Sequence, residues 1–179
     1  TIRNLELFYS LNEGACTLID VLDRTTSPMG SRLLKRWITL PLKEPQLIKE
    51  RHQVVDYFLS NEEVKTSIQD QIALMGDIER LVSKIATARI NPREVIQVKN
   101  ALNAIAPIKE ACEKSKEPAL IKAGEQLSIC QSALDRIEIE IEQDPPVQVI
   151  KGNVIKTGIS SELDELRHIR HSGKDYLLE

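Results

Sequence analysis

The stretch TSPMGSRLLKRWITLPL, residues 26–42, is the part of the sequence around which we expect the rest of the chain to be arranged. Pro28 stands near its start and Pro41 near its end, where proline first favours a helical turn and then prevents the helix from continuing. Apolar side chains recur between them at helical spacing, and these are Leu33, Leu34, Trp37, Ile38 and Leu40. The stretch therefore predicts a short amphipathic helix with sharp ends.

Trp37 is the only tryptophan in a chain with 3% aromatic residues. Its large apolar surface predicts a buried anchor, together with Leu33 and Leu34, against which neighbouring helices pack. Replacing a buried tryptophan by alanine costs about 3–5 kcal/mol, and we expect this for Trp37→Ala. These three residues are the structural anchors that the sequence predicts.

A basic face of the same segment carries Arg32, Lys35 and Arg36. Such a face can contact DNA phosphates. No aromatic or glycine-rich residues are interleaved with it, however, so pairing with helix carboxylates or solvation is the favoured interpretation. We expect these three residues to be structural.

Length and composition are those of an ordinary globular domain. The chain has 179 residues, which is enough to bury a core without disulfides, and its net charge of −3 argues against binding nucleic acid by bulk positive charge. The three cysteines are widely spaced and form no CxxC, which favours a reducing, cytoplasmic setting over a disulfide framework or a zinc site. No apolar run reaches the roughly 20 residues of a membrane helix, and no signal-peptide pattern opens the chain. We expect a soluble protein with no membrane partner.

The two ends of the sequence predict a fragment of a larger protein. The first residue is threonine, and residues 175–179 stop within an apolar-periodic pattern that has no capping signal.

Helix-start signals are spread along most of the chain. Capping boxes or N-terminal prolines occur at Thr17–Asp20, Pro45, Ser60–Glu63, Asn91–Glu94 and Ser161–Asp164.

Breaks between helices are expected at a few other positions. Gly76 separates two helical patterns, Pro107 is expected to kink or end a helix, and Pro118 closes a charged loop over residues 113–117. Two segments favour extended structure, namely residues 2–8 and a hairpin-like excursion over residues 147–158. The sum is an all-α fold of about nine helices, a multi-helix bundle with one or two short extended segments.

Residues 137–142 give conflicting signals. Ile137, Ile139 and Ile141 alternate with glutamates at period two, which alone favours a strand. Cys130 and Leu134 continue to Ile137 and Ile141 at steps of three and four, which favours a helix that runs on from the preceding one. We predict the helix, in which Ile139 lies off the face of its two neighbours.

A search for catalytic or ligand-binding chemistry finds no supported site. A phosphate-binding loop needs Gly-x-x-x-x-Gly-Lys-Ser/Thr, and neither Lys156-Thr157 nor Gly173-Lys174 completes one. His168 and His171 have metal-ligand spacing but lack a nearby third histidine or a cysteine, so a charged helix surface is the favoured interpretation. We expect no catalytic, cofactor-binding or metal residue, and we interpret Asp164, Glu165 and Arg167 as a solvent-facing helix surface.

Several motifs resemble, in order, those of the MutS family of DNA mismatch-repair proteins. They are residues 3–7 (RNLEL), 29–37 (MGSRLLKRW), 76–80 (GDIER), 92–93 (PR), 152–158 (GNVIKTG) and 162–167 (ELDELR). The run over residues 29–37 is the most specific. The last motif, with residues 173–176, favours the mismatch-repair branch over its bacterial paralogue.

The resemblance implies a part of such a protein. Residues 1–159 are similar to the N-terminal part of the core, or lever, domain, and residues 160–179 to the start of the helix that leads toward the clamp. The implied function is mechanical, coupling the DNA-binding parts to the ATPase. The mismatch-reading domain, the clamp and the ATPase have no motif in these residues, so the fragment is not expected to be an enzyme or to bind ATP or mismatched DNA by itself.

For the full-length protein, the resemblance implies ATP and magnesium as cofactors, mismatched duplex DNA and MutL as partners, a homodimer, and a bacterial cytoplasmic location. The alternative is an independent helical adaptor that binds a partner helix. An adaptor would expose an apolar groove. A final helix whose Leu163, Leu166 and Leu177 pack on the bundle would count against the adaptor, whereas a protruding final helix would suit the lever.

Overall fold

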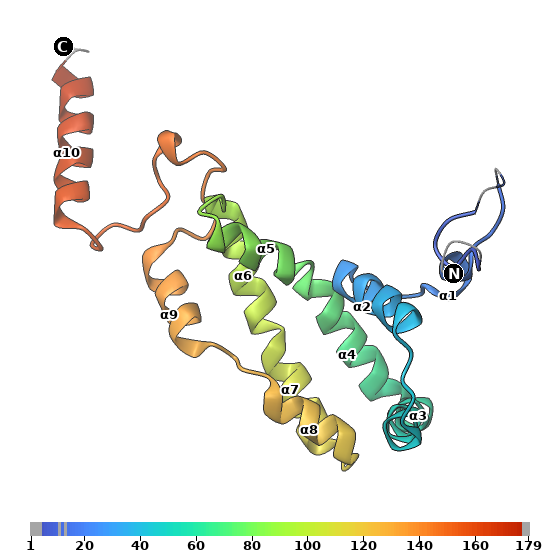
Figure 1. The fold of residues 1–179 in the computed structure, drawn as a ribbon. Coiled ribbons are helices and arrows are strands. Elements are labelled where there is room, and N and C mark those ends of the chain that lie inside the picture. The colour runs from blue at the N-terminus through green and yellow to red at the C-terminus, as the bar shows by residue number, and fades with distance from the viewer. Residues whose placement is uncertain (1–4, 11, 13, 177–179) are drawn as a thin grey trace.

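The computed structural model describes residues 5–10, 12 and 14–176, and these form an all-α fold, as the sequence predicts (Figure 1). The helices are α1 (Leu18–Leu22), α2 (Pro28–Thr39), α3 (Pro45–Ser60), α4 (Glu62–Met75), α5 (Ile78–Ala86), α6 (Pro92–Asn103), α7 (Ile105–Lys114), α8 (Pro118–Gln126), α9 (Gln131–Glu140), the 3₁₀ turn η1 (Val149–Lys151) and α10 (Ser161–Tyr176). In the described part of the chain, no helix is both long and apolar enough to cross a bilayer.

Most of the predicted helix starts are confirmed. Thr17 and Asn91 each form a complete capping box, and Pro28, Pro45 and Pro118 occupy the first turn of their helices. These signals are reliable because cap and proline effects act within a single turn and need no tertiary contact.

Helix ends also follow local signals. Gly76 ends α4 with φ 63°, a conformation that favours glycine. Pro107 lies in the first turn of α7, and α6 ends at Asn103, four residues before it. The proline ring would clash with that carbonyl in a continuous helix.

Two predicted capping boxes are wrong. Ser60 is the last residue of α3, and the side-chain Nδ2 of Asn61 donates a hydrogen bond back to the Tyr57 carbonyl oxygen at 2.8 Å. At α10 the cap lies one residue earlier than predicted, because the Ser160 hydroxyl oxygen accepts from the Leu163 N–H at 3.3 Å. Asp164 is thereby released for other contacts.

The helix predicted over residues 137–142 is confirmed as far as Glu140, and Ile139 is 60% exposed, off the buried face. Its predicted continuity with the preceding helix is wrong. α8 ends at Gln126, and Cys130 takes a left-handed conformation with φ 53°. Each of the two helices turns an apolar face inward, so side-chain periodicity alone does not reveal the break between them.

The two predicted extended segments differ from the structure. Residues 147–158 do not pair with each other. Ile155 instead forms an isolated antiparallel bridge with Ile141, and residues 149–151 form η1. In the predicted extended segment over residues 2–8, residues 2–4 lie outside the described part, and residues 5–8 form a turn and a bend. Alternation over so few residues does not specify a strand without a partner.

The core consists of two apolar clusters that share α7. The first contains Leu81, Val98, Leu102, Ile105 and Leu134, from α5, α6, α7 and α9. The second contains Ile68, Ile108, Cys112 and Leu120, from α4, α7 and α8, with α3 side chains packed against it. Helices α3 to α9 therefore form one body, which we call the bundle.

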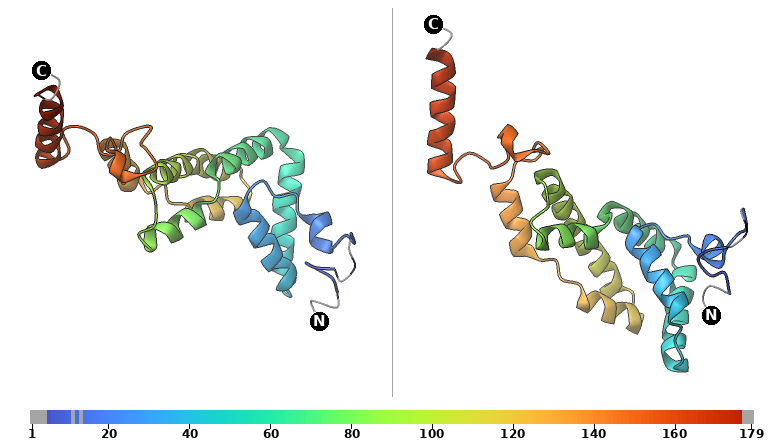
Figure 2. Two further views of the ribbon diagram at one scale, coloured as in Figure 1. Left: turned by 90° about the horizontal axis from the view of Figure 1, so that it is seen from above. Right: turned by 45° about the horizontal axis from the view of Figure 1, so that its top comes forward.

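The two terminal regions lie at opposite ends of the bundle. Helix α1 lies near α2 at one end, and α10 stands beyond the other end (Figures 1 and 2). On α10, Leu166 is 57% and Ile169 is 59% exposed. The final helix therefore protrudes from the bundle and leaves these apolar side chains uncovered.

Candidate functional site: the α2 junction and the root of the final helix

The N-terminus of α2 is built by short-range polar contacts. The buried Ser27 hydroxyl oxygen accepts from the Gly30 N–H at 3.2 Å. A Cβ at Gly30 would lie 3.1 Å from Cβ of Thr25, so the close approach of the preceding loop favours glycine there. The Ser31 hydroxyl donates to Asp23 Oδ2 at 2.6 Å, which fastens α2 to the residues that follow α1.

The Asp23 carboxylate accepts the hydrogen bonds that hold the corner between α1 and α2. Its Oδ1 also accepts from the hydroxyl of Thr25 at 2.6 Å and from the Thr25 N–H at 3.1 Å. The hydrogen bonds from Ser31 and then Thr25 favour the charged carboxylate and lower the pKa of Asp23 to about 2.

Arg32 joins α2 to the start of α5. Its guanidinium donates two hydrogen bonds to the Asp77 carboxylate, at 2.9 and 2.7 Å, and two to Glu79 Oε2, at 2.9 and 2.5 Å. The hydrogen bonds from Arg32 hold the pKa of Asp77 below its usual value. Arg32 thus has the fork geometry in which arginine binds carboxylates most specifically.

Asp77 has a second role in this junction. It is the N-cap of α5, where its Oδ1 accepts from the Arg80 N–H at 3.2 Å. The preceding Gly76 supplies the positive φ that turns the chain between α4 and α5. The MGSRLLKRW and GDIER motifs of the sequence therefore meet in space, through residues 45 positions apart.

The expected pairing of the basic face is confirmed for Arg32. Lys35 and Arg36 are exposed on the same helix. The sequence could not name the partners of Arg32, because nothing local to α2 shows that the start of α5 lies beside it.

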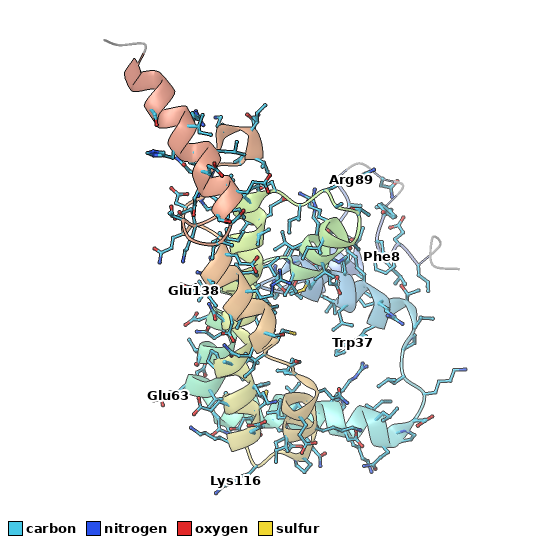
Figure 3. All side chains as sticks on the ribbon, turned by 90° about the vertical axis from the view of Figure 1, so that its left-hand side faces the viewer. Phe8, Trp37, Glu63, Arg89, Lys116 and Glu138 are labelled. Carbon is cyan, nitrogen blue, oxygen red and sulfur yellow. The ribbon has the colours of Figure 1, made fainter. Side chains whose placement is uncertain are left out.

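The prediction that Trp37 is a buried anchor together with Leu33 and Leu34 is wrong as to burial. Trp37 is 41% exposed, Leu33 is 47% exposed, and Leu34 is only partly buried. Trp37 extends from α2 toward α3, where the Arg51 guanidinium lies 3.5 Å from the centre of its ring (Figure 3). The ring of Trp37 stacks against a cation and is not enclosed in an apolar core, because α2 lies outside both apolar clusters. That these three residues act as anchors stays a prediction.

The root of α10 is a second polar junction. Asp164 Oδ2 accepts from the Gly158 N–H at 2.7 Å, and its Oδ1 accepts from Arg167 at 2.9 Å. Arg167 also donates to the Ile155 carbonyl oxygen at 2.6 Å. The interpretation of Asp164 and Arg167 as a solvent-facing surface is therefore wrong, because both are partly buried against the preceding loop.

That loop is in turn joined to α9. The Lys156 side chain donates to the Glu138 carbonyl oxygen at 2.6 Å, and the Ile141 and Ile155 backbones form a bridge. A continuous set of hydrogen bonds thus runs from α10 through residues 154–158 to α9.

Arg93 supports the same region from α6. It donates through Nε to the carbonyl oxygen of Pro145 at 3.0 Å, and Pro145 is fully enclosed. The PR motif, like those of α2 and α5, is therefore placed where two segments distant in sequence meet.

The histidines and cysteines that the structure describes do not come together in one site. His52 and His168 are exposed, and the side chain of His171 lies outside the described residues. Within the part of the chain that the structure describes, no group of three or more histidine, cysteine or acidic residues is placed to hold a metal ion. Cys112 is buried, which raises the pKa of its thiol, and Cys16 and Cys130 are exposed.

Among the grooves on the surface of the described residues, two bear on the function. One, of about 310 Å³, lies between α3 and α4 and is lined mainly by apolar residues, among them Val55, Phe58, Ile68 and Ile72. The other, of about 450 Å³, lies between residues 149–155 and α10 and is lined by Leu163, Leu166, Arg167 and Arg170 among others.

Fold and junctions together define an all-α domain, in which polar contacts attach the N-terminal helices and the final helix to a packed bundle. The family described as MutS domain III matches residues 1–177, and this chain belongs to that family.

Curated relatives extend this result over the whole chain. Proteins named DNA mismatch repair protein MutS from Bacteroides fragilis and Parabacteroides distasonis are 52% and 53% identical over 100% of this chain and 21% of their own lengths. The protein of the same name from Cytophaga hutchinsonii is 42% identical over the same shares. The chain therefore spans about a fifth of the length of these relatives.

Proposed function

We propose that this chain is the core, or lever, segment of a MutS-type mismatch-recognition ATPase and couples its DNA-binding parts to the ATPase. The observation that carries the proposal is the match of residues 1–177 to MutS domain III, in a chain whose final helix projects from the bundle. Coupling between distant sites needs an element whose contacts differ between two states. Packed helices transmit such changes as rigid-body shifts.

The hydrogen bonds at the root of α10 support this role. A displacement of α10 pulls on Ile155 through Arg167, and Ile155 is bridged to Ile141 at the end of α9. Leu134 of α9 belongs to the first apolar cluster, together with side chains from α5, α6 and α7. The final helix is thereby linked mechanically to the core of the bundle.

The chemical steps are assigned to parts of the protein outside these 179 residues. ATP and magnesium bind there, as do mismatched duplex DNA and MutL, in a cytoplasmic homodimer. This chain contributes no catalytic residue in the proposal, and residues 160–179 begin the helix that leads to the clamp.

Coupling is tested in the full-length gene product with Arg167→Met. This variant removes the hydrogen bond to Ile155 and the ion pair with Asp164 but retains an unbranched apolar stem. We expect ATP to change the affinity for mismatched DNA less than in the parent protein, with nucleotide-free DNA binding unchanged.

Arg136→Met is the matched control, because it breaks an exposed arginine–glutamate pair within one helix. An unaltered effect of ATP in Arg167→Met would contradict the proposal that this junction transmits the coupling.

The chain by itself is expected neither to hydrolyse ATP nor to prefer mismatched duplex at sub-micromolar concentration. Fluorescence anisotropy with matched and mismatched duplexes measures this. A clear preference for the mismatch would move recognition into these residues.

The adaptor function is the second candidate, and the apolar groove between α3 and α4 favours it. A partner helix could lay its apolar face there. Leu59, 71% exposed, lines the groove, so Leu59→Glu is expected to abolish partner binding if the adaptor proposal holds. Under the lever proposal the same variant leaves the effect of ATP on DNA affinity intact, provided that the protein folds.

A further inference from the structure

The N-terminal arm, which we define as residues 17–39, is attached to the bundle by different forces from those that hold the bundle together. No residue of α2 is buried, and none belongs to either apolar cluster. Burial of apolar surface is the main force that fixes one helix on another. That force is therefore weak between α2 and the bundle.

Within itself the arm is well connected. Thr17 caps α1 and is buried, as are Ile19 and Ser27. The bond from Ser31 to Asp23 closes the corner between α1 and α2. These contacts join α1 and α2 to each other, so the arm is expected to move as one unit.

Two side-chain contacts join the arm to the bundle, and each is made by a charged guanidinium. Arg32 donates its four hydrogen bonds to Asp77 and Glu79, and Arg51 of α3 stacks on Trp37. The covalent connection, residues 40–44, is non-helical and contains Pro41.

The Arg32 contact is of a kind that can open. The Arg32 side chain is 48% exposed and that of Glu79 is 63% exposed, so water and salt reach both groups. Asp77 keeps its capping bond to Arg80 without Arg32, so α5 remains capped when the contact breaks.

We propose that Arg32, Asp77 and Glu79 form a latch that fixes the N-terminal arm on the bundle, and that the latch opens while the bundle stays folded. The arm then swings about residues 40–44. This motion is a property of the chain itself and does not depend on the coupling proposed above. The sequence motifs over residues 29–37 and 76–80 supply the two halves of the latch.

Hydrogen exchange measured by mass spectrometry on the full-length gene product tests the latch. In Arg32→Met, the backbone amides within the segment 28–39, which begin after Pro28, are expected to exchange about fivefold faster, the change that corresponds to losing an exposed ion-pair network. Amides of α6 and α7 are expected to keep their rates. Arg136→Met removes an equivalent pair within α9 and is expected to leave residues 28–39 unchanged.

Salt provides a second measurement on the unmodified protein. Exchange of residues 28–39 is expected to rise between about 0.05 and 0.5 M NaCl, because screening weakens exposed pairs. In Arg32→Met this salt dependence is expected to disappear. The salt measurement remains decisive if the variant does not fold.

Three results would overturn the proposal. They are a rise in residues 28–39 no larger than in Arg136→Met, an equal rise throughout α6 and α7, and exchange of residues 28–39 in the unmodified protein that does not respond to salt. The second would show that Arg32 supports the whole fold and not a separable arm.

Discussion

The bundle and the N-terminal arm are both helical but are stabilised differently. Leu102 and Ile108 of the bundle are 8% exposed, whereas Leu33 and Trp37 of the arm are 47% and 41% exposed. Both regions have amphipathic sequences. An apolar stripe therefore predicts a helix in both, but it does not predict what covers the stripe. In the bundle, other helices of this chain cover it, and on the arm polar side chains make the contacts.

The strongest test of this comparison is a truncation in the bundle. Leu102→Ala leaves a cavity in the first apolar cluster. It is expected to lower the free energy of unfolding by about 3 kcal/mol, because truncating a buried leucine loses both transfer energy and packing. Leu33→Ala, the matched change on the arm, is expected to cost less than half of that. Urea denaturation followed by circular dichroism measures both. Equal losses would mean that the arm is as firmly packed as the bundle.

A second test adds volume. A Cβ at Gly124 of α8 would lie 3.0 Å from Cβ of Cys112 on α7, so Gly124→Val is expected to cost about 2 kcal/mol through overpacking.

Gly173 of α10 is the control, because a Cβ there meets nothing within 4 Å. Gly173→Ala is expected to stabilise its helix by up to about 1 kcal/mol. A Gly124→Val variant as stable as the parent protein in the same denaturation measurement would show that α7 and α8 have room for the larger side chain.

Trp37→Ala tests how firmly the arm is packed on the bundle. The expected cost is now about 1–2 kcal/mol, below that of a buried tryptophan, and it includes the loss of the stack with Arg51. Trp37→Phe retains an aromatic face for Arg51 and is expected to cost less. A loss above about 3 kcal/mol would restore Trp37 as a buried anchor.

The smallest expected effect is the acid response of the arm. Since the pKa of Asp23 is lowered to about 2, its contribution to stability is present above the ordinary value of about 4 and is lost as the pH falls toward 2. Carboxyl NMR titration measures the midpoint directly. Ser31→Ala removes the hydrogen bond with the largest influence and is expected to raise the pKa. An unchanged midpoint would show that Ser31 does not hold Asp23.

Features of the fold that depend on neighbouring residues were predicted from the sequence more often than features that depend on distant ones. Pro28, Pro45 and the capping box at Asn91 placed helix starts correctly because they act within one turn. The break at Cys130 and the pairing of Ile141 with Ile155 were not predicted, since each depends on a segment distant in sequence. The α10 junction was misjudged for the same reason. Charged residues on a helix are usually solvated, and only the fold shows that Arg167 reaches a backbone carbonyl.

The sequence by itself determined that this chain is helical, where most of its helices begin, and which family its motifs resemble. Those properties depend on neighbouring residues or on the order of motifs along the chain. Only the tertiary structure decided what the segment over residues 26–42 contacts. It showed that Arg32 is held by Asp77 and Glu79 and that Trp37 is half exposed. The physical reason is that burial and ion pairing depend on which distant helix lies alongside, and the pattern within one helix does not contain that information.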